Sequence, residues 1–245
     1  MTLALLALLI VVLAVLAWRA VNRERRDYAR FKRLRSTTLR RQVFRKWLLE
    51  SLIVLGGLAG IVLLGAWSYV PLALREARAW GPFGELSDAA AGWIVVGVVV
   101  GGLVLMLVPV LVLRGQVDEI PAVGDIRAIL PRERGELKYG AGLALTAGVV
   151  EELLFRLALP ALVFGVIGNG PLAFLLCALA FGALHLYQGP LGILFATVLG
   201  LVFTALYVLS GSILLTIVIH AVVDLRSLLL IPIVLGGAWK RPEAA

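Results

Sequence analysis

Residues 92–113 read GWIVVGVVVGGLVLMLVPVLVL, a run without a single charged side chain. A strand of a globular protein is usually about 5–6 residues long, whereas about 20 apolar residues of helix cross the hydrocarbon of a bilayer. This run therefore predicts a membrane-spanning helix. Further apolar runs, separated by short polar segments, occupy residues 2–18, 47–70, 139–167, 171–187, 190–209 and 212–236. The sequence thus predicts an all-α, multi-pass transmembrane bundle of about seven spans.

The composition supports this fold class. Hydrophobic residues make up 61% of the 245 residues and charged residues only 16%, with a mean hydropathy of +1.01. Soluble domains are usually about 45–50% apolar and about 25% charged, so a water-soluble domain and a disordered chain are both excluded. The single cysteine, Cys177, lies in an apolar run and excludes an internal disulfide.

The net charge of +8 is concentrated in one segment. Residues 19–46 hold twelve Lys and Arg and two acids, which is +10, so the rest of the chain carries −2. A basic segment between two apolar runs is typical of a cytoplasmic loop that faces anionic headgroups, and we do not expect nucleic-acid binding. Alternation then places the N-terminus and residues 71–91 outside, and residues 114–138 and the C-terminal tail in the cytoplasm. We expect a multi-pass protein of a prokaryotic cell membrane.

The chain divides into two unequal parts. Residues 1–138 form a membrane region with about three spans, the basic segment 19–46 and the polar linker 114–138. Residues 139–236 hold four apolar runs joined by GNGP, QGP and Ser210-Gly211, and residues 237–245 form a tail. Connections this short predict antiparallel neighbours in one four-helix core.

Ionisable residues set the second part apart. The apolar runs of the first part are almost free of charge, whereas those of the second contain or adjoin several ionisable residues, including both histidines of the protein. A charge at the bilayer centre costs roughly 2.5–3.5 kcal/mol on insertion scales, so these groups must pair inside the bundle or line a wet cavity. They are Glu151, Glu152, Arg156, His185, His220, Asp224 and Arg226.

The spacing of these residues predicts specific pairs. Glu152 and Arg156 are i and i+4 and suit a salt bridge on one helical face. Glu151 points about 100° away from Glu152, toward different surroundings. His220 and Asp224 are also i and i+4, so an imidazole and a carboxylate share one face of another helix.

Three motifs resemble a known family of intramembrane proteases. The chain reads EELLFR at 151–156, FGALH at 181–185 and HAVVD at 220–224. The order and spacing resemble the pattern Glu-Glu-x-x-x-Arg, Phe-x-x-x-His and His-x-x-x-Asn/Asp of the CAAX-protease and bacteriocin-processing (CPBP, or Abi) family, which includes the type II CAAX prenyl endopeptidases. The resemblance covers about residues 139–236 and implies a peptidase whose active site lies in a membrane cavity.

The resemblance also implies roles for individual residues. Glu151 matches the general base that, with His185, activates a water molecule, and His220 and Asp224 match the groups that stabilise the oxyanion. Glu152, Arg156 and Phe181 match supporting positions. Where the family often has Asn, this chain has Asp224, and an ionised Asp cannot donate a hydrogen bond. Asp224 therefore either orients His220 or is kept protonated by apolar surroundings.

Two other interpretations of the same residues stay open. Glu151, His185 and His220 are also a common zinc ligand set, although no HExxH motif is present. We favour chemistry that requires no cofactor and keep zinc as the alternative. Each pair taken alone could be a purely structural contact, but the joint occurrence of the three motifs favours chemistry.

The function predicted from the sequence is an intramembrane endopeptidase that acts on a membrane-associated protein or peptide. Two alternatives belong to other classes: a proton- or ion-coupled carrier, because buried Glu, His and Asp also mark ion pathways, and a non-catalytic membrane scaffold or immunity protein. Transporters often carry paired, repeated halves, whereas the polar residues here lie in one half only, which argues against the carrier.

Overall fold

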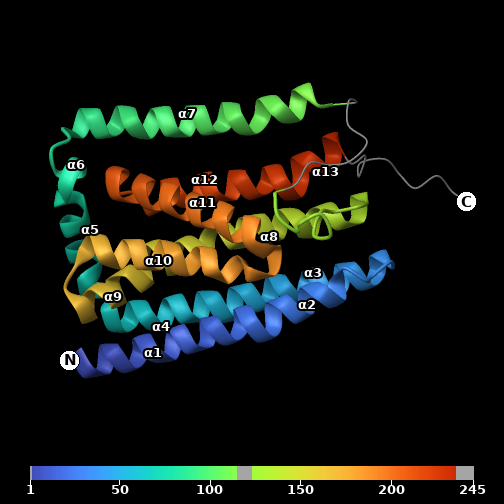
Figure 1. Ribbon diagram of the computed structural model, residues 1–245. Coiled ribbons are helices and arrows are strands. Elements are labelled where there is room, and N and C mark those ends of the chain that lie inside the picture. Colours follow the sequence, from blue (N-terminus) through green and yellow to red (C-terminus); the bar gives the residue numbers. More distant parts are fainter. Residues whose placement is uncertain (1, 115–122, 236–245) are drawn as a thin grey trace, which may run out of the picture.

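The computed structural model describes residues 2–114 and 123–235, and this part of the chain is helical without a strand (Figure 1). The predicted all-α membrane bundle is therefore confirmed. Five helical runs are long and apolar enough to cross a membrane, and the figure of about seven spans stays a prediction. The five runs are Leu3–Phe31, Thr37–Ala79, Asp88–Val112, Gly170–Ser210 and Ile213–Val234.

The first half of the chain folds into two long helical runs, a short crossing segment and one further long helix. The two long runs contain π-helical turns, labelled η1 and η2, and the crossing segment begins with a 3-10 turn, η3. The elements are α1 (Thr2–Trp18), η1 (Arg19–Glu24), α2 (Arg25–Phe31), α3 (Thr37–Glu50), η2 (Ser51–Gly56), α4 (Gly57–Ala66), η3 (Trp67–Tyr69), α5 (Val70–Ala79), α6 (Gly81–Gly84) and α7 (Asp88–Val112).

The second half folds into four helical segments joined by tight connections. Its elements are α8 (Arg134–Glu152), η4 (Leu153–Ala158), α9 (Leu159–Ile167), α10 (Gly170–Leu184), η5 (His185–Gln188), α11 (Gly189–Ser210), α12 (Ile213–Leu225), η6 (Arg226–Leu230) and α13 (Ile231–Val234). The run from Gly170 to Ser210 contains two helices, because the chain folds back at η5 and α11 packs along α10 (Figure 1).

Capping residues explain why these connections are short. Gly168 ends α9 in the left-handed conformation (φ 66°), and the side chain of Asn169 then accepts from the Leu172 N–H to begin α10. Gly211 (φ 67°) ends α11 in the same way, and Ser212 caps α12. Glycine adopts the left-handed conformation at the lowest energetic cost. The glycines in the polar breaks of the sequence therefore mark the positions where these helices end.

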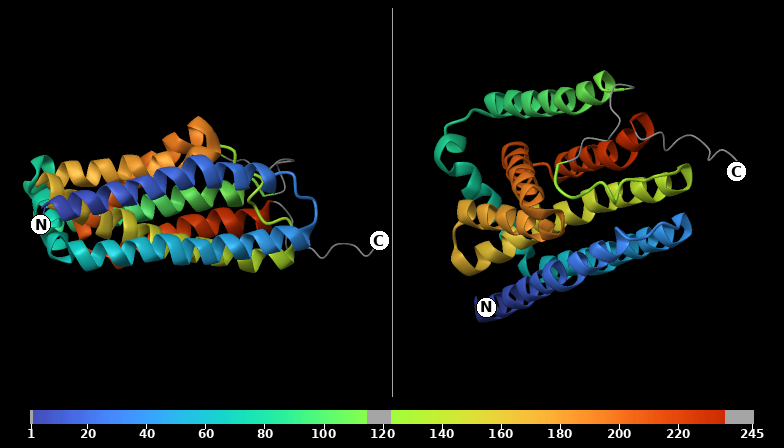
Figure 2. Two further views of the ribbon diagram at one scale, coloured as in Figure 1. Left: turned by 90° about the horizontal axis from the view of Figure 1, so that it is seen from below. Right: turned by 45° about the vertical axis from the view of Figure 1, so that its right-hand side comes forward.

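The long helices lie roughly along one axis, with two distinct ends, and α5 and α6 run across one of these ends (Figures 1 and 2). The turn between α2 and α3 lies at the end where α8 begins, and α5 and α6 lie at the opposite end with the start of α1. The basic segment 19–46 and the described part of the linker 114–138 therefore share one end. Which face of the membrane meets that end stays a prediction.

A buried ion pair joins α3 to the beginning of α8. Arg40 Nε donates to Glu136 Oε1 at 2.8 Å, and both side chains are fully buried. The same guanidinium donates to the carbonyls of Ala128 at 2.9 Å and Leu130 at 3.1 Å. We expected residues 19–46 to face anionic headgroups. Arg40 does not do so, because all of its contacts lie inside the protein.

The core that positions the site draws on both halves. Val62 of α4 and Val12 of α1 pack in one apolar cluster with Leu154 and Leu162. Within the second half, α8 packs closely along α12, and a Cβ atom added at Gly148 would lie 2.9 Å from Cβ of Ala221. This close approach brings the carboxylates at the end of α8 next to the imidazole on α12.

Candidate active site

Glu152 is the residue that links two helices of the site. Its Oε1 atom lies 2.9 Å from Arg156 Nη1, as the i, i+4 spacing predicts, and 2.7 Å from His220 Nδ1 on α12. The side chains of Glu152 and Arg156 are fully buried. Because an ionised carboxylate only accepts, His220 Nδ1 donates to Glu152 and its Nε2 atom is left for other partners. The contact with His220 joins residues 68 positions apart, and sequence spacing did not show it.

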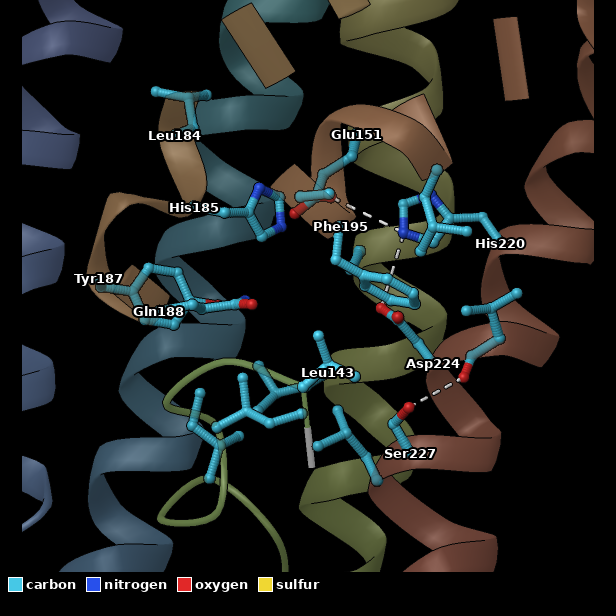
Figure 3. A pocket seen from close by; sticks show the side chains of 18 of the residues that line it. Leu143, Glu151, Leu184, His185, Tyr187, Gln188, Phe195, His220, Asp224 and Ser227 are labelled. Atoms are coloured by element: carbon cyan, nitrogen blue, oxygen red, sulfur yellow. Dashed lines mark hydrogen bonds and ion pairs between the residues drawn. The ribbon is translucent and has the colours of Figure 1, made fainter. Parts of the chain in front are cut away.

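The Nε2 atom of His220 faces two further carboxylates. Glu151 Oε2 lies 3.8 Å away and Asp224 Oδ2 lies 3.7 Å away, as the dashed lines in Figure 3 show. Both distances exceed those of an ordinary hydrogen bond. The partner that fixes the His220 ring is therefore Glu152, and Asp224 is an electrostatic neighbour of the opposite ring nitrogen.

His185 lies where α10 ends and the 3-10 turn η5 begins. Its Nδ1 atom is 2.9 Å from the carbonyl oxygen of Phe181, four residues earlier. A carbonyl only accepts, so Nδ1 carries the hydrogen and Nε2 is free to accept. This contact satisfies a carbonyl in the last turn of α10 and caps the helix. It also fixes the orientation of a ring that faces the cavity (Figure 3).

Phe181 contacts three members of the site. Its ring centroid lies 4.8 Å from that of His185 and 6.1 Å from that of His220. The guanidinium of Arg156 lies over the same ring at 4.4 Å and donates to the Gly200 carbonyl at 3.3 Å. Phe181 thus holds both imidazoles and the arginine in place.

One cavity of about 590 Å³ receives these groups. Glu151, His185, His220 and Asp224 line it, whereas Glu152 and Arg156 lie behind His220 and do not. The remaining lining is largely apolar and comes from both halves of the chain. A cavity of about 300–1,000 Å³ takes a small organic ligand, which here corresponds to a few residues of peptide. The four residues to which the resemblance gives catalytic roles therefore share one space.

Two adjacent polar residues of the lining, Tyr187 and Gln188, received no role from the sequence. Tyr187 and Gln188 lie between His185 and the Gly189-Pro190 break. The only sequence feature that marks them is that they are two polar residues in an otherwise apolar segment. Arg226 Nε donates to the Met106 carbonyl on α7 at 2.8 Å. This contact is of the pairing kind expected for an arginine beside an apolar run.

The zinc alternative requires about three protein ligands around one metal ion. Among the residues that the structure describes, no three His, Cys, Asp or Glu side chains are placed to hold one. His185 and His220 each direct Nδ1 to an oxygen acceptor within 2.9 Å, which leaves only Nε2 of each ring. The zinc set Glu151, His185 and His220 stays an alternative for experiment.

The comparisons with known proteins agree with the motifs. Residues 134–226 match the family model described as Type II CAAX prenyl endopeptidase Rce1-like. No curated protein and no solved structure matches the chain. The match begins at the first residue of α8 and ends just after α12, so it contains all three motifs. It confirms the resemblance to the CPBP proteases over this segment, and residues 1–133 lie outside it.

Proposed function

We propose that this chain, whose residues 134–226 match the type II CAAX prenyl endopeptidase family, hydrolyses a peptide bond of a membrane-associated protein or peptide. The observation that supports it most is the cavity, because Glu151, His185 and His220 come from three different helical segments and line one space. Peptide hydrolysis needs a base beside a water molecule and donors where negative charge develops. These three side chains supply both.

The proposed reaction begins with a water molecule between Glu151 and His185. The Glu151 carboxylate takes one proton, while His185 Nε2 accepts a hydrogen bond that orients the water. The water oxygen bonds to the peptide carbonyl carbon, and negative charge develops on the carbonyl oxygen. When the C–N bond breaks, Glu151 returns the proton to the leaving amine nitrogen, so one residue acts as base and then as acid.

His220 is the proposed donor to the oxyanion. Glu152 accepts from its Nδ1 atom at 2.7 Å and fixes the ring. When the imidazole carries both protons, Nε2–H donates to the developing oxyanion, and the carboxylates of Glu151 and Asp224 lie 3.8 and 3.7 Å from that nitrogen. An ionised Asp224 does not donate itself. We therefore assign it an electrostatic role beside Nε2.

The experiment is cleavage of an internally quenched, leucine-rich fluorogenic peptide by the full chain purified in detergent. We expect cleavage by the wild type, equal cleavage after dialysis against a chelator, and an unchanged rate for Glu85→Gln. This control makes the same chemical change at an exposed position outside the cavity. A chelator-sensitive rate would favour the zinc alternative. A wild type that cleaves no peptide would favour the scaffold or the carrier.

A further inference from the structure

Two adjacent residues with uncharged polar side chains line the cavity outside the three motifs. Tyr187 and Gln188 belong to η5, the turn that also carries His185, and both point into the cavity from the side opposite His220 and Asp224 (Figure 3). Gln188 Nε2 donates to the Tyr187 hydroxyl oxygen at 2.9 Å. The two side chains therefore form one hydrogen-bonded pair beside the proposed catalytic groups.

This pair keeps unused hydrogen-bonding capacity. Tyr187 accepts from Gln188, so its own O–H hydrogen is left to donate. Gln188 keeps its carbonyl oxygen and its second amide hydrogen. Within the described residues, neither side chain makes another hydrogen bond. The pair thus presents donors and an acceptor to whatever occupies the cavity.

The turn that carries the pair is held rigidly. The Gln188 carbonyl accepts from the Asp125 N–H at 2.9 Å, and the Tyr187 ring lies 5.2 Å from that of Tyr28. Gly189 (φ 78°, ψ −178°) ends the turn in a conformation that only glycine adopts readily. Gly124 (φ 75°) approaches so closely that an added Cβ would lie 3.0 Å from the Gln188 carbonyl oxygen. Rigid support lowers the entropy lost when a ligand binds.

The chemistry of the pair fits the main chain of a peptide. A peptide in a largely apolar cavity carries N–H and C=O groups that are costly to leave unpaired. Glu151, His185 and His220 in the same lining have roles in the proposed reaction, whereas the Gln188 amide offers a neutral donor and a neutral acceptor together. We propose that Gln188 accepts from a main-chain N–H of the substrate and that Tyr187 donates to a main-chain carbonyl beside the scissile bond. This inference rests on the proposed function.

The test uses two substitutions that keep the shape of the pair. Tyr187→Phe retains the ring that contacts Tyr28 and His185, and Gln188→Met retains the length of the side chain. Tyr69→Phe and Gln42→Met are matched controls, because neither residue lines the cavity. The probe is a short leucine-rich peptide with a fluorescein label and a benzophenone cross-linker. A second probe replaces one main-chain N–H by an ester oxygen.

The first readout is the peptide concentration at half-maximal photo-cross-linking in detergent, which does not require cleavage. Partition of the peptide into the micelle is the same for every variant, so differences report on the cavity. We expect each cavity substitution to raise this concentration by about 3- to 10-fold, the effect of one lost hydrogen bond. The ester probe should bind the wild type more weakly than the amide probe does. Its binding to the wild type should be no weaker than the binding of the amide probe to Gln188→Met.

The second readout separates binding from chemistry. We expect KM for the fluorogenic peptide to rise by about 3- to 10-fold, with kcat within about 2-fold of the wild type. Unchanged cross-linking in both variants, a fall in kcat at constant KM, or absence of saturable cross-linking to the wild type would overturn the inference. Saturable cross-linking without any cleavage would contradict the proposed function instead. The change in half-maximal peptide concentration between the variants and the wild type would then still decide whether the pair binds the peptide.

Discussion

Among the single residues of the site, Glu152 joins two buried polar partners. It is fully buried and is the counterion of Arg156 as well as the acceptor for His220. Glu152→Gln would leave a buried guanidinium without a negative partner, and breaking a buried pair costs about 3–5 kcal/mol. We therefore expect a clearly lower Tm in detergent together with reduced cleavage.

The control for Glu152 is the exposed pair of Arg78 and Asp88, whose atoms lie 3.1 Å apart. Asp88→Asn removes a charge from an ion pair in the same way, but its side chain is 98% exposed. We expect its Tm to match the wild type. If Glu152→Gln had the same Tm as the wild type, Glu152 would not be the counterion that stabilises this part of the fold.

Asp224 is a second residue whose replacement is informative. Its Oδ2 atom lies 3.7 Å from His220 Nε2, and Glu152, not Asp224, orients the ring. Asp224→Asn adds a donor and restores the residue that the family often has. We expect kcat/KM within about tenfold of the wild type, a smaller loss than the about 10²–10⁴ for a lost general base. A rate at the level of the uncatalysed control would show that the negative charge itself is required.

A contact between two site residues could be predicted from the sequence only where both residues lie on the same helix. The spacing of Glu152 and Arg156 indicated their contact, because residues four apart lie on one face. The bond from His220 to Glu152 spans two helices, and helix packing decides it. The contacts of Tyr187 and Gln188 likewise depend on Tyr28 and the loop at Asp125, which are distant in the sequence.

At the scale of elements, the pair of Arg40 and Glu136 fastens the basic segment to the start of α8. Arg40 lies over the rings of Phe31 and Phe44, at 4.5 and 5.5 Å from their centroids, and has no exposed surface. Arg40→Gln would leave Glu136 buried without its cation. We expect a destabilisation of about 3–5 kcal/mol, seen as a lower Tm in detergent.

Arg45→Gln is the matched control, because Arg45 is an exposed arginine of the same helix. Its Tm should stay at the wild-type value. Equal effects of the two substitutions would mean that the basic segment acts only through its overall charge. An effect of Arg40→Gln alone would show that this buried arginine stabilises the fold in a way that the exposed Arg45 does not.

The helix ends were predictable from the sequence, but the helix interiors held features that were not. Gly168-Asn169 and Gly211-Ser212 mark ends that the polar breaks indicated. The π-helical turn Leu153–Ala158 begins within the EELLFR motif and extends two residues beyond it, where an ideal α-helical period was assumed. A π-helical turn adds a residue to the local repeat, and hydrophobic periodicity over so short a segment does not show it.

At the scale of the whole molecule, the uneven charge predicts the orientation in the membrane. Residues 19–46 carry +10 and lie at the end opposite α5 and α6. In intact cells, we expect an impermeant maleimide to label Glu85→Cys from outside and Arg35→Cys only after permeabilisation. Both positions are exposed, and the native Cys177 is buried, so background labelling is low. Labelling of both positions from one side would contradict this topology.

The fold class followed from the long apolar runs, but the contribution of the first half to the site did not. The family match covers residues 134–226, yet Tyr28 and the loop at Asp125 support the turn that carries His185. Apolar runs show that helices cross the membrane and say little about which of them meet. The neighbours of each helix depend on side-chain shape across helices far apart in the sequence.

The measurement that tests the proposed function most directly is the cleavage rate of Glu151→Gln. The amide keeps the volume of the side chain but does not take a proton from water at neutral pH. We expect kcat to fall by about 10²–10⁴, with the Tm in detergent unchanged, because Glu151 faces the cavity and is not the buried counterion of Arg156. Cleavage at the wild-type rate by a folded Glu151→Gln protein would contradict the assignment of the base.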